Sequence, residues 1–164
     1  MQGVEKIMAA VDFSQYSQAT LRMALGLARD IGSALVAVNV LNQRDVEAMR
    51  HAVKSGQAMG VSEKDFIARQ TRERLQMLAD LLRECGADPE RVEMVIKVGV
   101  PAQEVLEAIG ETRADLVVMG AKGRTNLAMA LFGSTAERVF RRSPVPVLSV
   151  RGAEFRTELG KLGA

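Results

Sequence analysis

Cysteine and histidine are nearly absent from this chain of 164 residues, which contains one of each. The single cysteine, Cys85, cannot form a disulfide within the chain, and this usage is typical of the reducing cytoplasm. Its place near the end of a helical pattern favours a packing role over a nucleophilic one. The single histidine, His51, lies in a polar stretch, which argues against a Ser-His or Cys-His catalytic site. No His or Cys spacing predicts a metal site.

Aromatic residues and excess charge are also scarce. A net charge of +2 and an aromatic content of 4% give little basis for binding or stacking on nucleic acid. No apolar run approaches the roughly 18 residues that span a bilayer. An apparent strand begins where a signal peptide would stand. We therefore expect a cytoplasmic protein without a nucleic-acid or membrane partner.

Strand and helix patterns alternate along the chain. Apolar, β-branched runs predict strands over 4–11, 34–41, 91–98, 115–119 and 145–150. Helical periodicity predicts helices from Ser14 or Ser17 to residue 31, over 62–85, after Pro101 and over 136–142, with a short helical piece inside 42–61. This alternation predicts an α/β fold, a single doubly wound five-stranded parallel sheet with helices on both faces. We expect one domain over 1–151 and a polar tail over 152–164.

The most informative segment runs from Gly120 to Thr135. Gly120, Gly123 and Gly133 stand in the spacing Gly-x2-Gly-x9-Gly-Ser after an apolar strand. Glycines there let the backbone turn and let a bulky anion approach the main chain. Ser134 and Thr135 at a helix start add free amides and two hydroxyls, which suit a phosphate. The segment predicts a bound nucleotide.

The loop after the first strand, Asp12-Phe13-Ser14, is expected to share this site. Open α/β sheets bind ligands beyond the carboxyl ends of their strands, where the winding direction reverses. If strands 4–11 and 115–119 are central neighbours, Asp12 meets the glycine segment there. The spacing matches neither the dinucleotide fingerprint nor a Walker A loop.

Simpler structural interpretations remain open for these residues. Ser134 with Glu137 forms a capping-box pattern, so Ser134 could act only as a helix cap. Glu137 also places a negative charge near the predicted phosphates. Asp12 could likewise cap the first helix. Register with the three glycines favours phosphate contact for Ser134, and the place of Asp12 beside the glycine loop favours a ligand role for Asp12.

The chain resembles the universal stress proteins, in particular the subgroup that binds ATP, over nearly its whole length. The resemblance rests on Val11-Asp12-Phe13-Ser14, the long second helix, Val98-Gly99-Val100-Pro101, the Gly-x2-Gly-x9-Gly-Ser loop and Pro144-Val145-Pro146-Val147. It implies a Rossmann-like fold of the adenine nucleotide alpha-hydrolase type. It also implies ATP as the ligand, with AMP or ADP as alternatives and Mg²⁺ or Mn²⁺ accompanying the phosphates.

The resemblance implies positions for the nucleoside. Ala10 and Asp12 would lie against adenine and ribose. The backbone of Val40 would hydrogen-bond the adenine edge, and Met119 and Gly120 would adjoin the ribose.

It also implies positions for the phosphates. Gly123 and Arg124 would lead the backbone along them, and Gly133, Ser134 and Thr135 would hold the distal ones. Lys122, inside the loop, would add positive charge.

Catalysis has little support in the sequence, because no acidic residue is evidently placed to orient a water on a terminal phosphate. We expect an ATP-binding regulatory or stress-response protein. The alternatives are a slow ATPase or self-phosphorylating enzyme, and an interaction module without nucleotide. An unidentified protein partner is expected, as is a homodimer through the strand Val145–Val150, since an apolar edge strand invites pairing with a second copy. The universal stress proteins resembled here commonly associate through that strand.

Overall fold

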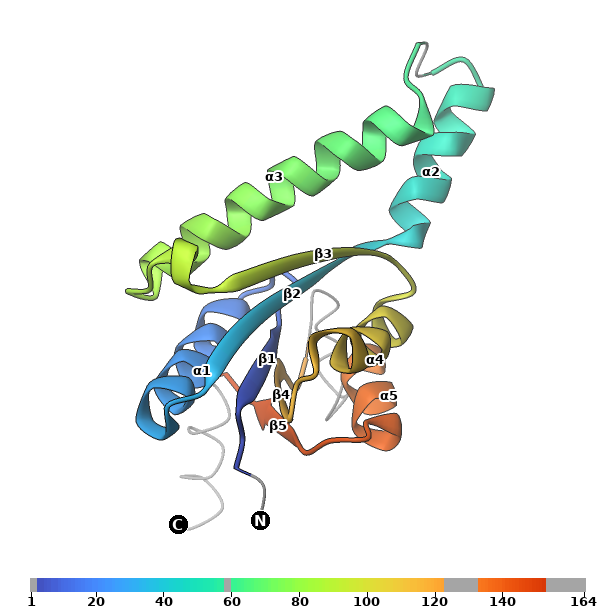
Figure 1. The fold of residues 1–164 in the computed structure, drawn as a ribbon. Helices are drawn as coiled ribbons and strands as arrows, with labels where there is room; N and C mark the ends of the chain where they lie inside the picture. The colour runs from blue at the N-terminus through green and yellow to red at the C-terminus, as the bar shows by residue number, and fades with distance from the viewer. Residues whose placement is uncertain (1–2, 58–59, 123–132, 153–164) are drawn as a thin grey trace, which may run out of the picture.

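The computed structural model describes residues 3–57, 60–122 and 133–152. Its strands are β1 (Lys6–Ala10), β2 (Ala34–Asn42), β3 (Glu93–Gly99), β4 (Leu116–Gly120) and β5 (Val147–Val150). Its helices are α1 (Ser17–Ile31), α2 (Gln43–Lys54), α3 (Glu63–Glu84), α4 (Pro101–Thr112) and α5 (Ser134–Arg142), with a 3₁₀ turn at Pro89–Arg91. Figure 1 shows these helices arranged around one twisted sheet.

The five strands form one parallel sheet in the order β3-β2-β1-β4-β5. The fold class predicted from the sequence is confirmed. The chain runs from β1 through β2 to β3 and then crosses to β4 and β5 on the other side of β1. The winding therefore reverses between β1 and β4, where Ala10 lies beside Met119. That is the position at which such sheets bind ligands.

Helices cover both faces of the sheet, α1 and α3 on one and α4 and α5 on the other (Figure 1). Ile7 and Ala9 of β1 belong to the core under α1 and α3, whereas Met8 belongs to the core under α4 and α5. A strand covered on both faces is apolar nearly throughout, which is the pattern that predicted it. Among the described residues no helix is both long and apolar enough to cross a membrane.

Consecutive helices α2 and α3, residues 43–84, are here called the α2–α3 arm. Figure 1 shows α3 crossing over β2 and β3, while α2 continues from the end of β2 beyond the sheet. The two helices are joined by a bidentate contact from Arg50 to Glu63, at 2.9 and 3.0 Å. The short helical piece expected inside 42–61 is thus the twelve-residue helix α2.

The Gly99-Val100-Pro101 segment positions α4. A Cβ at Gly99 would stand 2.7 Å from Cδ of Glu104, so a side chain at this position would displace the Glu104 side chain. Glu104 then pairs with Lys97 at 3.5 Å. The pKa of Lys97 is raised, first by its hydrogen bond to Glu111. Pro101 is the first residue of α4, a position at which proline costs no hydrogen bond.

Helix α1 begins at Ser17, one of its two predicted starts, but neither Ser14 nor Ser17 is its N-cap. The N-cap is Tyr16, which makes no side-chain cap bond. The reason is Asp12, whose Oδ1 accepts hydrogen bonds from the Ser14 N–H at 3.0 Å and from Ser17 Oγ at 3.3 Å. Ser14 Oγ instead accepts from the Tyr16 N–H at 3.3 Å.

Several strands are shorter than predicted or shifted. β5 begins at Val147 rather than Val145, since Pro144 and Pro146 lack an N–H and Ser143 Oγ binds the Val145 backbone in a turn. β1 spans Lys6–Ala10 rather than 4–11, because the N–H groups of Glu5 and Lys6 donate to the Asp115 carboxylate.

Residues 91–92 lie outside β3, because Asp88 caps the 3₁₀ turn that ends at Arg91. The predicted tail over 152–164 lies outside the described residues apart from Gly152.

Candidate functional site

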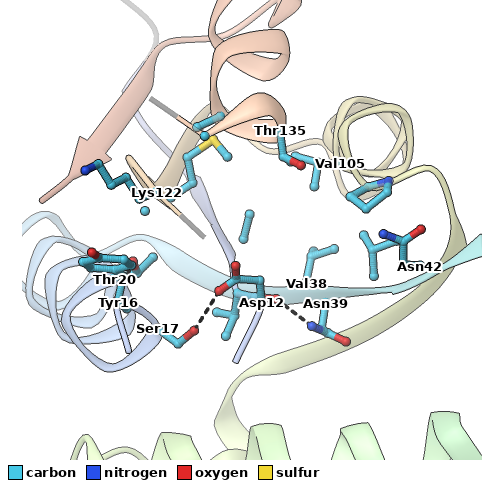
Figure 2. A pocket seen from close by; sticks show the side chains of 18 of the residues that line it. Asp12, Tyr16, Ser17, Thr20, Val38, Asn39, Asn42, Val105, Lys122 and Thr135 are labelled. Carbon is cyan, nitrogen blue, oxygen red and sulfur yellow. Dashed lines mark hydrogen bonds between the residues drawn. The ribbon is translucent and has the colours of Figure 1, made fainter. Parts of the chain in front are cut away.

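A cavity of about 220 Å³ opens at the carboxyl ends of β1, β2 and β4. Most of the predicted site residues line it: Ala10, Asp12, Val40, Met119, Gly120, Lys122, Gly133, Ser134 and Thr135. In Figure 2 Asp12 lies between Tyr16, Thr20 and Lys122 on one side and Asn42, Val105 and Thr135 on the other. Gly123 and Arg124 lie outside the described residues. The structure thus brings together the predicted residues that it describes, from positions 10 to 135.

Asp12 enters the cavity from a tightly held turn. Its carboxylate accepts hydrogen bonds from the Ser14 N–H in the turn and from the hydroxyl of Ser17, the first residue of α1. Figure 2 shows the bond to Ser17. Phe13 follows with a φ of 59°, a left-handed conformation that is uncommon for a residue with a side chain. This turn directs the chain back into α1 and leaves the Asp12 carboxylate at the cavity.

Val40 presents its backbone to the cavity because β2 is longer than β1. Just after β1, the Val11 N–H donates to the Val38 carbonyl of β2 at 2.8 Å, which continues the β1–β2 backbone pairing by one residue. Backbone polar groups of successive strand residues point to opposite edges. Val40, two residues beyond Val38, therefore turns its N–H and C=O toward the edge from which β1 has departed. One donor and one acceptor face the space above Ala10.

The start and end of the glycine segment are held together. The Gly133 N–H donates to the Ala121 carbonyl at 2.8 Å, and the Ala121 N–H donates to Val150 of β5. A Cβ at Gly120 would stand 2.9 Å from the Lys122 carbonyl oxygen and 3.4 Å from Cβ of Tyr16. Gly120 is therefore required by the close approach of β4 to α1 and to its own turn.

Helix α5 directs its first turn at the cavity. It begins at Ser134, two residues before the predicted start, with Gly133 as N-cap and no side-chain cap bond in the described structure. The first intrahelical donor is the Glu137 N–H, which bonds to Gly133. The preceding amides, on Ser134, Thr135 and Ala136, belong to residues that line the cavity. Such amides carry the positive end of the helix dipole.

The capping-box interpretation of Ser134 does not fit this geometry, since Ser134 is the first helical residue rather than the cap. The charge of Glu137 is also partly offset, because its carboxylate pairs with Arg141 at 3.3 Å.

Several lining residues were not predicted: Tyr16, Ser17 and Thr20 of α1, Asn39 and Asn42 of β2, Arg44 of α2, and Pro101 and Val105 of α4. The sequence pattern contained a signal for some of these residues. Asn39 is the polar residue within an apolar strand, and Ser17 and Thr20 share one helix face next to Asp12. Nothing in the sequence placed Arg44 or Val105 near the site, because α2 and α4 reach it only through tertiary packing.

Cys85, outside the cavity, fits a structural role. The pKa of the Cys85 thiol is raised, mainly by burial, which agrees with a packing role at the end of α3. In the described ranges no group of three His, Cys, Asp or Glu residues is arranged to hold a metal ion.

Comparison with known proteins gives one consistent family. The sequence model of the universal stress protein family matches residues 3–151. Universal stress protein MJ0531 of Methanocaldococcus jannaschii is 30% identical over 147 residues, which cover 90% of this chain and 82% of that protein.

Solved structures share the fold. The structure of MJ0577, also from Methanocaldococcus jannaschii, has a TM-score of 0.73 at 24% identity and covers 91% of this chain and 96% of its own. A universal stress protein in complex with cAMP has a TM-score of 0.60 at 23% identity, with 92% and 98% covered. The universal stress protein of Archaeoglobus fulgidus in complex with dAMP has a TM-score of 0.56 at 20% identity, with 91% and 98% covered.

Proposed function

Because this chain belongs to the universal stress protein family, we propose that it is a cytoplasmic regulatory protein that binds ATP in the cavity at the β1–β4 crevice. One observation carries the proposal: the Asp12 carboxylate, the exposed backbone edge of Val40 and the first turn of α5 converge on one cavity. Relatives in complex with cAMP and dAMP support an adenine nucleotide as the ligand.

The cavity has a suitable group for each part of ATP. The N–H and C=O of Val40 match the donor and acceptor of the adenine edge, above Ala10 and beside Met119. The Asp12 carboxylate would accept hydrogen bonds from the ribose hydroxyls. The phosphates would lie toward Lys122 and the amides of Ser134 and Thr135, where the helix dipole favours negative charge. Gly123 and Arg124 complete this assignment only through the resemblance to the family, since they lie outside the described residues.

A divalent cation would accompany the phosphates. The described residues hold no ready-made cluster of metal ligands, so Mg²⁺ or Mn²⁺ would be held chiefly by the phosphate oxygens. AMP or ADP would occupy the nucleoside end of the same cavity, with fewer contacts at α5.

Turnover is expected to be negligible. Phosphoryl transfer needs a positioned nucleophile and charge stabilisation in the transition state. Asp12, the acidic residue that lines the cavity, already accepts hydrogen bonds from Ser14 and Ser17. Protein mixed with ATP and Mg²⁺ should retain the nucleotide and release little phosphate over minutes in a phosphate-release assay. A rate of about one per second that vanishes in Asp12→Ala would instead establish an ATPase.

A homodimer through the β5 edge is expected. β5 pairs only with β4 in the described sheet and so presents an edge for a second copy. Val147→Lys, which puts a charge on that edge strand, should convert the dimer to a monomer in sedimentation at micromolar concentration. Thermal melts of the variant check that it is still folded, because Val147 also packs against the core. A monomeric wild type, or a folded Val147→Lys dimer, would contradict this assembly.

A further inference from the structure

Asn39 is a polar side chain buried in the middle of β2, with an exposed fraction of 1%. Its Nδ2 donates to the Val11 carbonyl oxygen at 2.7 Å, and its Oδ1 accepts from Arg74 Nη1 at 3.0 Å. A buried amide is costly to leave without hydrogen bonds. Both ends of this side chain therefore have a fixed partner, one on the residue that follows β1 and one on α3.

The bond to Val11 fixes the chain immediately before Asp12. The N–H of Val11 donates to Val38 and its C=O accepts from Asn39, so β2 holds both polar groups of this residue. The turn that follows is constrained by the Asp12–Ser14 bond and by the left-handed Phe13. Figure 2 shows the Asn39 side chain beside Asp12 at the base of the cavity. The direction in which Asp12 enters the cavity thus depends on Asn39.

Arg74 extends this connection to the α2–α3 arm. It comes from α3 with its side chain 12% exposed, and its Nη2 lies 3.7 Å from the Asp45 carboxylate of α2. The start of α2 is itself at the cavity, because Asn42 caps the helix and lines the cavity together with Arg44. One guanidinium therefore contacts α2 and, through Asn39, the residue before Asp12.

We propose that Arg74 and Asn39 are positioning residues that hold Asp12 for the nucleotide and couple occupancy of the cavity to the α2–α3 arm. This inference rests on the proposed ATP site. A nucleotide bound to Asp12 favours the arrangement in which Asn39 and Arg74 are engaged. Coupling between two sites is reciprocal, so whatever holds the arm in this arrangement strengthens ATP binding by the same factor.

Arg74→Ala tests the coupling, with Arg72→Ala as the matched control, since Arg72 is an exposed arginine on the same helix. Calorimetric titration with ATP gives the affinity, and hydrogen exchange with and without ATP gives the protection of amides 46–54 in α2. We expect Arg74→Ala to bind ATP about tenfold more weakly and to lose the ATP-dependent protection of α2. Arg72→Ala should match the wild type in both measurements.

Asp45→Asn tests the contact between Arg74 and α2 separately from the bond between Arg74 and Asn39. It also provides the test if Arg74→Ala does not fold. It weakens the contact between Arg74 and α2 and leaves the Arg74–Asn39 bond in place. The ATP-dependent protection of α2 should be lost. Because the coupling is reciprocal, ATP affinity should fall only by the factor by which ATP protects α2 in the wild type, and by less than in Arg74→Ala, which also loses the bond to Asn39.

Wild-type affinity and protection in Arg74→Ala, or undiminished protection in Asp45→Asn, would overturn the coupling and leave the ATP site standing. A wild-type protein that gives no binding heat with ATP would overturn the ATP site and the coupling together.

Discussion

Gly123→Val is expected to abolish ATP binding while the protein stays folded. In the sequence Gly123 stands between Ala121 and Gly133, whose backbones are joined by a hydrogen bond. The resemblance to the ATP-binding universal stress proteins implies that Gly123 lies where the phosphates approach the backbone, so a side chain there would exclude them by volume. The fold depends mainly on the apolar core on the two faces of the sheet, so we expect the variant to remain folded.

Gly110→Val is the matched control for this variant. Gly110 is an exposed residue of α4, and a Cβ there would meet no atom within 4 Å. Both variants should show cooperative thermal melts, and only Gly123→Val should fail to bind in calorimetric titration. If Gly123→Val binds ATP as tightly as the wild type does, the glycine segment does not bind the phosphates.

Asp12→Ala is expected to weaken ATP binding strongly. Hydrogen bonds to a charged group contribute about 1.5–3 kcal/mol, so loss of the ribose contacts should reduce affinity by about 10- to 100-fold. The variant also loses the bonds from Ser14 and Ser17, so its melting temperature should fall modestly. Titration and melts on the same sample separate these two effects.

Two further variants test whether the loss of ATP affinity comes from the charge of the Asp12 carboxylate. Asp12→Asn keeps an oxygen that can accept from Ser14 and Ser17 but has no charge, so its affinity should lie between those of the wild type and Asp12→Ala. Asp30→Ala removes the same charge from the exposed end of α1 and should bind ATP normally. Equal affinities for Asp12→Ala and the wild type would leave Asp12 with only a structural role.

Elements with local signals could be predicted closely from the sequence. The helix expected over 62–85 is α3, Glu63–Glu84, with Ser62 as its N-cap and Cys85 as its C-cap. Ser62 Oγ accepts from the Asp65 N–H at 3.0 Å, and Gly86 follows with a φ of 79°. The signals that set these ends lie within four residues of them, so no tertiary contact was needed to find them.

The start of α1 shows where local signals mislead. Ser14 and Ser17 are both good capping residues, yet Asp12 takes the Ser14 N–H and the Ser17 hydroxyl. Three polar side chains compete for the same few backbone donors, and the sequence alone does not rank them.

The candidate site was predicted where it follows from topology and missed where it follows from packing. Asp12 follows β1 and Gly120 ends β4, and these two strands are neighbours in the sheet, so the rule for parallel sheets brings the two residues together. The partner of Asn39 is Arg74, 35 residues later, on a helix whose rotation over the sheet is set by its buried leucines. The sequence showed that Asn39 is a polar residue within an apolar strand, but it did not show that Arg74 is its partner.

Calorimetric titration of the wild-type protein with ATP tests the central claim most directly. The account predicts saturable binding of one nucleotide per chain, in competition with AMP and ADP. Absence of saturable binding up to millimolar ATP, in the presence of Mg²⁺ and with a folded protein, would contradict it.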